Sequence, residues 1–125
     1  MIRGVGVDII EIGRIRHSIE ESGERFLERI FTPQEIAYCR SKKDMFQHFA
    51  VRFAAKEAMS KALSTGWVDS FRWKDVEVVN DRSGQPRIAV HGKLRDSLTT
   101  SSVFVSMSHS DSHAVAMVLI EEQDR

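Results

Sequence analysis

The chain has 125 residues, 42% of them hydrophobic and 29% charged, so it is long and apolar enough to fold as one globular domain over residues 1–125. Its 18 basic and 18 acidic residues cancel, which argues against a general nucleic-acid-binding surface. The single cysteine excludes a disulfide framework and a cysteine-cluster metal site, and no long apolar run or signal pattern is present, so we expect a cytoplasmic protein without a membrane partner.

The first predicted element is a buried strand over residues 1–10, because this run is mostly apolar and rich in β-branched side chains. Asp8 lies within this strand or at its end. A buried carboxylate is costly without a partner. Two interpretations of Asp8 therefore stay open: it is a metal ligand, or it is the N-cap of the next helix.

Helical periodicity follows over residues 11–30, and Gly23 is expected to divide this stretch into two helices. Arginines and glutamates alternate along it. They form either an ordinary solvated face or a docking surface for an acidic partner. The next residues, Thr32, Pro33 and Glu35, carry the signature of a capping box and predict the start of a short helix.

The longest helix is predicted over residues 44–65, with Gly66 as its stop. Within it, Phe53, Glu57 and Lys61 are spaced four residues apart and share one side, so a carboxylate and an ammonium lie one turn apart. An ordinary surface ion pair is the alternative to a functional site.

Four strand-like runs complete the chain, and they should form two hairpins. These runs are residues 76–80, 87–91, 103–108 and 114–120. Gly84 and Pro86 mark the first turn, and a short helix is expected over residues 93–100. A strand, then helices, then hairpins predict an α+β fold in which a long central helix packs on a mainly antiparallel sheet.

Asp8 and Glu57 are the two acids on well-ordered apolar elements. Two carboxylates, together with phosphate oxygens and water, are the usual way in which a protein holds Mg²⁺. Lys61 could then reach the same phosphate. The residues themselves therefore indicate a magnesium–phosphate site.

A third candidate lies where a strand enters a polar turn, at Ser108 and His109. A hydroxyl and an imidazole there could hold phosphate oxygens or a ribose. A plain turn histidine is the alternative, and His113 competes for the same role. No pair of nucleophile and base stands out in the sequence.

Three blocks of this chain resemble the holo-(acyl-carrier-protein) synthases, the small bacterial type of 4′-phosphopantetheinyl transferase. The blocks are GVGVDIIEIGRI at residues 4–15, RFAAKEAMSKAL at 52–63 and SMSHS at 106–110. The resemblance implies transfer of the 4′-phosphopantetheine arm of coenzyme A to a serine of an apo acyl carrier protein, with adenosine 3′,5′-bisphosphate as the other product. It also implies a homotrimer with active sites between subunits.

The same resemblance assigns roles to individual residues. Asp8, Glu57 and the pyrophosphate would hold Mg²⁺, Lys61 would contact the phosphates, and Glu57 is our candidate for the base. The other implied coenzyme contacts are Arg52, which would reach a neighbouring subunit's site, and Lys42, Lys43, Gly66, Pro86, Ser108 and His109. Arg14 and Arg25 would dock the acidic carrier protein. The rival interpretations are a non-catalytic coenzyme A- or nucleotide-binding module and a purely structural oligomer.

Overall fold

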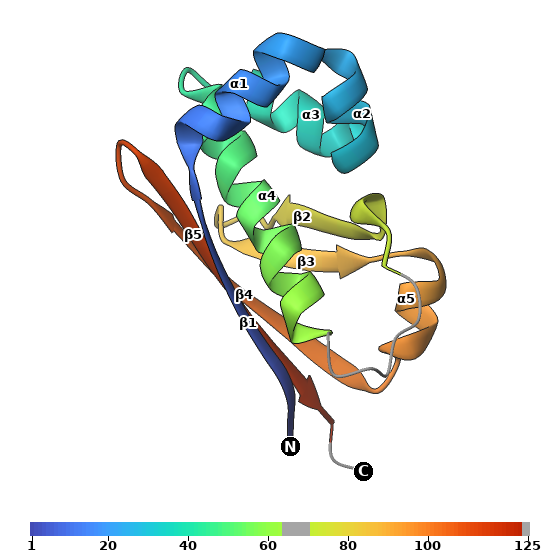
Figure 1. The fold of residues 1–125 in the computed structure, drawn as a ribbon. Helices are drawn as coiled ribbons and strands as arrows, with labels where there is room; N and C mark the ends of the chain where they lie inside the picture. Colours follow the sequence, from blue (N-terminus) through green and yellow to red (C-terminus); the bar gives the residue numbers. More distant parts are fainter. Residues whose placement is uncertain (64–70, 124–125) are drawn as a thin grey trace.

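The computed structural model describes residues 1–63 and 71–123 (Figure 1). The helices are α1 (Ile12–Ser22), α2 (Glu24–Ile30), α3 (Pro33–Arg40), α4 (Met45–Ala62), α5 (Gly92–Ser97) and a short 3₁₀ turn, η1 (Trp73–Asp75). The strands are β1 (Ile2–Glu11), β2 (Val76–Asn80), β3 (Pro86–Val90), β4 (Ser101–His109) and β5 (His113–Glu122). The predicted α+β class with antiparallel strands is confirmed, since both sheets are antiparallel.

The strands form a three-stranded sheet in the order β1-β5-β4 and a separate β2–β3 hairpin. Helix α4, which has 18 residues, lies between the three-stranded sheet and the hairpin, and α1, α2 and α3 gather around its N-terminal end (Figure 1). Its alanines and large apolar side chains face several directions. A helix that is apolar on most sides is stable only when it is covered on most sides.

Two apolar clusters make up the core. One joins the C-terminal half of α4 to β2, α5 and the inner face of the sheet, and the other lies under α1, α2 and α3 around Phe31 and Phe49. Cys39 belongs to the second cluster and is fully buried, and burial raises the pKa of its thiol to about 12. Cys39 is therefore a packing residue, since it carries no thiolate at neutral pH.

Most predicted boundaries agree with the structure. Gly23 separates α1 from α2 at a φ of 54°, and Thr32 forms the capping box with Glu35. The predicted end of the long helix is wrong, because α4 ends at Ala62 and Leu63 is its C-cap. The predicted stop at Gly66 lies outside the described residues. In the described part of the chain, no helix has the length and apolarity needed to cross a membrane.

The outer face of the three-stranded sheet carries a set of exposed apolar side chains. They are Val5, Val7 and Ile9 on β1, Phe104 on β4 and Met117 on β5. The alternation of strand residues places them on the face opposite to α4. One side of this sheet thus belongs to the core, and the other presents apolar surface.

Candidate active site

The glycines of β1 bring this strand against α4. A Cβ atom added at Gly6 would lie 1.9 Å from the carbonyl oxygen of Ala58, and one at Gly4 would lie 2.1 Å from that of Ala62. Only glycine permits so close an approach. Asp8 follows two residues after Gly6, so it is on the same inward face of the strand and points toward the same helix.

Asp8 does not cap the following helix, because Glu11 occupies the N-cap position of α1. The capping interpretation is therefore wrong. The Asp8 carboxylate instead meets Lys61 of α4, whose Nζ lies 3.0 Å from Asp8 Oδ1 and 3.1 Å from the carbonyl oxygen of Val7. Lys61 thus ties the strand to the helix.

Glu57 lies one helical turn before Lys61 and lines the same cleft as Asp8. Partial burial raises the pKa of the Glu57 carboxyl, the negative charge of Asp8 raises it further, and Lys61 opposes both effects. The two acids that sequence reasoning selected therefore lie close enough to interact. They form the acidic floor of one site.

This cleft has a volume of about 640 Å³. Phe26 and Phe53 give it an apolar wall, and their rings stack with centroids 6.4 Å apart. Arg14 lines the same cleft from α1. The cleft therefore combines paired carboxylates, an aromatic wall and a basic rim.

The donor set fits a magnesium ion that shares its ligands with a phosphate. Asp8 and Glu57 repel one another, and a divalent cation would relieve that repulsion. Among the described residues no group of three or more His, Cys, Asp and Glu side chains could hold a metal on its own. Mg²⁺ commonly takes one or two carboxylates and completes its shell with water and substrate phosphates.

The two predicted docking arginines lie beside this cleft. Arg14 belongs to its lining, and Arg25 lines an adjoining hollow with Arg29 and Phe26. Phe26 is common to both, so the basic surface is continuous with the acidic site. Arg16, which lies between these two arginines in the sequence, instead forms an ion pair with Glu20 at 3.4 Å.

A second cleft, of about 510 Å³, lies beside the β2–β3 hairpin. Lys42, Tyr38, Asn80 and Gly84 line it, so the structure brings the predicted contact Lys42 to the hairpin turn. The lining also includes Arg82 and the acids Glu77 and Asp81, so this cleft offers both basic and acidic groups beside the Tyr38 ring.

Arg52 lies behind this second cleft, in contact with two of its lining residues. Its side chain is buried, Nη2 donates to Asn80 Oδ1 at 2.7 Å, and the guanidinium lies 4.4 Å from the centroid of the Tyr38 ring. Its Nε is buried without a hydrogen-bond partner among the described residues. Asn80 and Tyr38 thus hold the guanidinium, and contact of Arg52 with a neighbouring subunit's site stays a prediction.

His48 marks the region that these basic groups share. Burial lowers the pKa of its imidazole, and the charges of Arg52, Lys42 and His109 contribute to the lowering. Three predicted coenzyme contacts thus gather around one histidine that sequence reasoning did not select. His48 lies one helical turn before Arg52, and that spacing was the available signal.

The remaining predicted contacts are scattered. Ser108 is exposed on the outer face of β4, whereas Asp8 is on the inner face of β1, so one chain does not bring these two side chains together. His113, the competitor of His109, lies 2.8 Å from the Ser112 hydroxyl. Lys43 is exposed before α4, and Pro86 begins β3 opposite Asn80. Gly66 lies outside the described residues.

Sequence reasoning missed the role of two further residues. Phe26 was assigned to the helical period of the core, yet it also forms the cleft wall. Lys56, directly before Glu57, was passed over, although it is the most deeply buried lysine among the described residues. A lysine directly after two alanines of this central helix was the only signal for it.

Comparison with known proteins agrees with these features. Residues 4–118 match the family model of the 4′-phosphopantetheinyl transferase superfamily. The chain is 48% identical to a holo-(acyl-carrier-protein) synthase of Geobacter sulfurreducens over 124 residues, which cover 97% of this chain and 98% of that protein.

Solved structures give the same result. The crystal structure of a Bacillus anthracis holo-(acyl-carrier-protein) synthase in complex with CoA (3′,5′-ADP) has a TM-score of 0.82 and 38% identity, covering 98% of this chain and 99% of that one. The Neisseria meningitidis enzyme has a TM-score of 0.86 at 31% identity, covering 98% and 100%. With a match of this extent in sequence and in fold, the chain belongs to the 4′-phosphopantetheinyl transferase superfamily.

Proposed function

We propose that this chain is a holo-(acyl-carrier-protein) synthase that acts with Mg²⁺. It transfers 4′-phosphopantetheine from coenzyme A to a serine hydroxyl of an apo acyl carrier protein and releases adenosine 3′,5′-bisphosphate. The observation that carries the proposal is the convergence of Asp8, Glu57 and Lys61 from two distant segments on one cleft. Neither a binding module nor a structural oligomer requires that convergence.

Asp8 and Glu57 would hold the magnesium ion together with pyrophosphate oxygens. When bound, the ion neutralises charge that develops on those oxygens. Lys61 lies beside Asp8 and supplies a second positive charge for the phosphates. Glu57 accepts the serine proton directly or through a water.

The carrier protein docks on the basic surface around Arg14 and Arg25. Because this surface adjoins the cleft through Phe26, a carrier bound there can present its serine to Glu57. Exposed charges of this kind steer association and fix orientation, and salt screens them. The phosphopantetheine arm would lie against the aromatic wall.

The nucleotide end of coenzyme A would occupy basic groups near His48, including Lys42 and His109. We propose that a homotrimer brings these groups of one subunit to the Asp8 cleft of the next. The exposed apolar outer face of β1 and its neighbours supports this arrangement, because a lone chain would leave that surface in water. The enzyme is expected to work in the cytoplasm, where Cys39 stays reduced.

The test is to incubate the protein with coenzyme A, Mg²⁺ and an apo acyl carrier protein, and to follow the mass of the carrier. A gain of one phosphopantetheine that Glu57→Gln or EDTA abolishes supports the proposal. Binding of coenzyme A without transfer by the wild type would favour the module. Neither binding nor transfer would favour the structural oligomer.

A further inference from the structure

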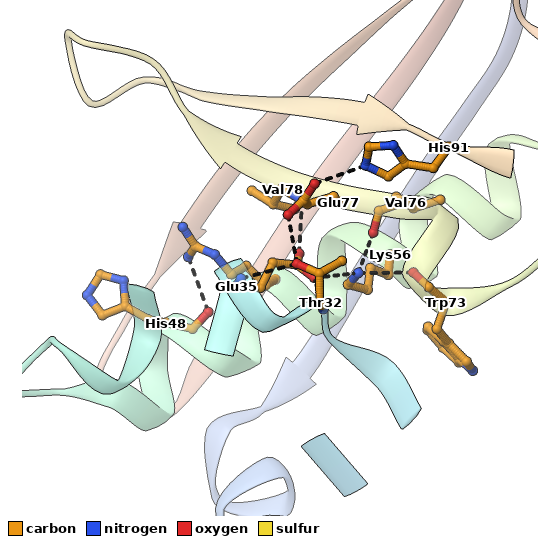
Figure 2. A network of polar contacts seen from close by, with 10 residues as sticks. Thr32, Glu35, His48, Lys56, Trp73, Val76, Glu77, Val78 and His91 are labelled. Atoms are coloured by element: carbon orange, nitrogen blue, oxygen red, sulfur yellow. Dashed lines mark hydrogen bonds and ion pairs between the residues drawn. The ribbon is translucent and has the colours of Figure 1, made fainter. Parts of the chain in front are cut away.

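A fully buried ion pair lies behind the cleft. The side chains of Lys56 on α4 and Glu35 on α3 are both 0% exposed, and Lys56 Nζ lies 2.9 Å from Glu35 Oε1. The ammonium also donates to the carbonyl oxygen of Trp73 at 3.0 Å and to that of Val76 (Figure 2). Three acceptors match its three protons.

Glu35 is held as firmly as its partner. Its Oε1 accepts the Thr32 N–H and its Oε2 accepts the Val78 N–H, both at 2.9 Å. The Thr32 hydroxyl donates to Glu77 at 2.7 Å, and the ring of His91 lies 2.9 Å from that second carboxylate (Figure 2). The contacts therefore lock α3, α4 and the β2–β3 hairpin together.

The same contacts lead to the cleft wall. Trp73, whose carbonyl group binds Lys56, stacks its ring on Phe53 with centroids 5.3 Å apart and an interplanar angle of 20°. Phe53 stacks in turn on Phe26, and both line the cleft with Glu57. Lys56 is the direct neighbour of Glu57, so any rotation of α4 that moved one side chain would move the other.

We propose that the buried Lys56–Glu35 pair is a positioning element for the active site, which fixes the rotation of α4 and seats Trp73 against Phe53 so that Glu57 faces Asp8. This inference rests on the proposed function, because it assigns the pair a part in aiming the proposed base. Lys56 is a positioning residue, since its ammonium group is occupied by Glu35 and two carbonyl groups.

Stability alone is a weak reason for such a pair. Replacing both members of a buried pair by uncharged groups is often neutral or stabilising, whereas removing one member leaves an unpaired buried charge. Comparing the single variants with the double variant therefore separates a role of the pair in positioning from a role in stability. Each single change, Lys56→Met or Glu35→Gln, should lower the melting temperature strongly, and the double variant should recover part of that loss because no unpaired buried charge remains. Glutamine has a single acceptor oxygen, so it can keep the Thr32 N–H bond of the capping box but loses the bond from the Val78 N–H.

The experiment compares kcat, the KM for coenzyme A and the Glu57 pKa of the wild type and the double variant. Positioning predicts a kcat about ten- to a hundred-fold lower, as expected for a misplacement on the order of 1 Å, with a smaller change in KM. The Glu57 pKa, titrated by carboxyl NMR without metal, should move away from its wild-type value. Lys74→Met, the same change at an exposed lysine, is the matched control and should leave all three unchanged.

A folded double variant with wild-type kcat and wild-type Glu57 pKa would overturn the proposal, whatever its melting temperature. If the double variant does not fold, the kcat of the Trp73→Leu variant tests the proposal instead. That side chain is half-buried, and the change keeps the carbonyl group that binds Lys56 but removes the ring from Phe53. An unchanged kcat in Trp73→Leu would then refute the proposal. A wild type that transfers nothing would instead refute the proposed function, and the NMR titration would still test the positioning.

Discussion

The contact between β1 and α4 gives the most direct test of how this fold builds its site. Gly6→Ala places a methyl group where the Ala58 carbonyl oxygen stands 1.9 Å away, and ordinary contact begins at 3.4 Å. The obstacle is backbone on a buried helix, which cannot move aside as a flexible side chain would. The strand and the helix must therefore separate by roughly 1.5 Å, because close-packed interiors transmit such strain.

Two effects of different kind should follow. Overpacking of a tight core typically costs about 1–3 kcal/mol of unfolding free energy, which is about 4 °C of melting temperature per kcal/mol in a chain of this size. Asp8 moves with the strand while Glu57 and Lys61 stay with the helix. A displacement on the order of 1 Å in a catalytic arrangement can lower the rate about a hundred-fold.

The assay is thermal unfolding at one fixed protein concentration, together with single-turnover transfer at a temperature where the variant is folded. Gly13→Ala is the stability control, because a Cβ atom there meets nothing within 4 Å and its φ is not positive. That variant should melt at or above the wild-type temperature. A Gly6→Ala variant that is destabilised yet transfers at the wild-type rate would show that this contact does not place Asp8.

Four further outcomes are expected. Glu57→Gln should lower turnover about 10²- to 10⁴-fold. Because folding raises the Glu57 pKa above its ordinary value of 4.5, the ionised carboxylate disfavours the metal-free fold, so the Gln variant should melt higher at pH 7 and lose this advantage as the pH falls toward 4.5. Arg14→Glu should raise the KM for carrier protein about ten-fold in steady-state kinetics and leave the KM for coenzyme A alone; an equal effect on both would contradict docking. Lys42→Ala should weaken coenzyme A binding several-fold in calorimetry, with carrier binding unchanged. Val7→Lys, on the exposed sheet face, should give monomers in sedimentation equilibrium, and an intact trimer would refute our placement of the interface.

Local signals in this sequence translated reliably into structure. The capping box of Thr32 and Glu35, the break at Gly23 and both hairpins depend on neighbours within a few residues, so pattern and turn chemistry suffice to predict them. The carboxylate of Glu35 shows where such reasoning ends. One oxygen of this carboxylate completes the predicted cap. The ion pair of Glu35 with Lys56, however, depends on how α3 packs on α4.

Arg52 is a second case in which local pattern does not identify a tertiary partner. The five-residue offset of Arg52 from Glu57 places the two side chains on different sides of the helix. What the guanidinium meets there is Asn80, which arrives from the β2–β3 hairpin, and no periodicity within α4 reports on that hairpin. The identity of a tertiary partner was therefore beyond the reach of local pattern.

The pairing register of the sheet separates the turn after β4 from Asp8. His109 pairs with Ala114, which pairs with Ile10, so the polar turn after β4 lies two strands away from the strand that carries Asp8. Ser108 and Asp8 moreover occupy opposite faces of that sheet. If Ser108 and Asp8 contact one coenzyme molecule, the simplest arrangement is that each comes from a different chain. Mixing a Glu57→Gln chain with a His109→Ala chain should then restore part of the transfer, because some mixed interfaces would carry neither defect. Two inactive variants that stay inactive after mixing and subunit exchange would place the whole site within one chain.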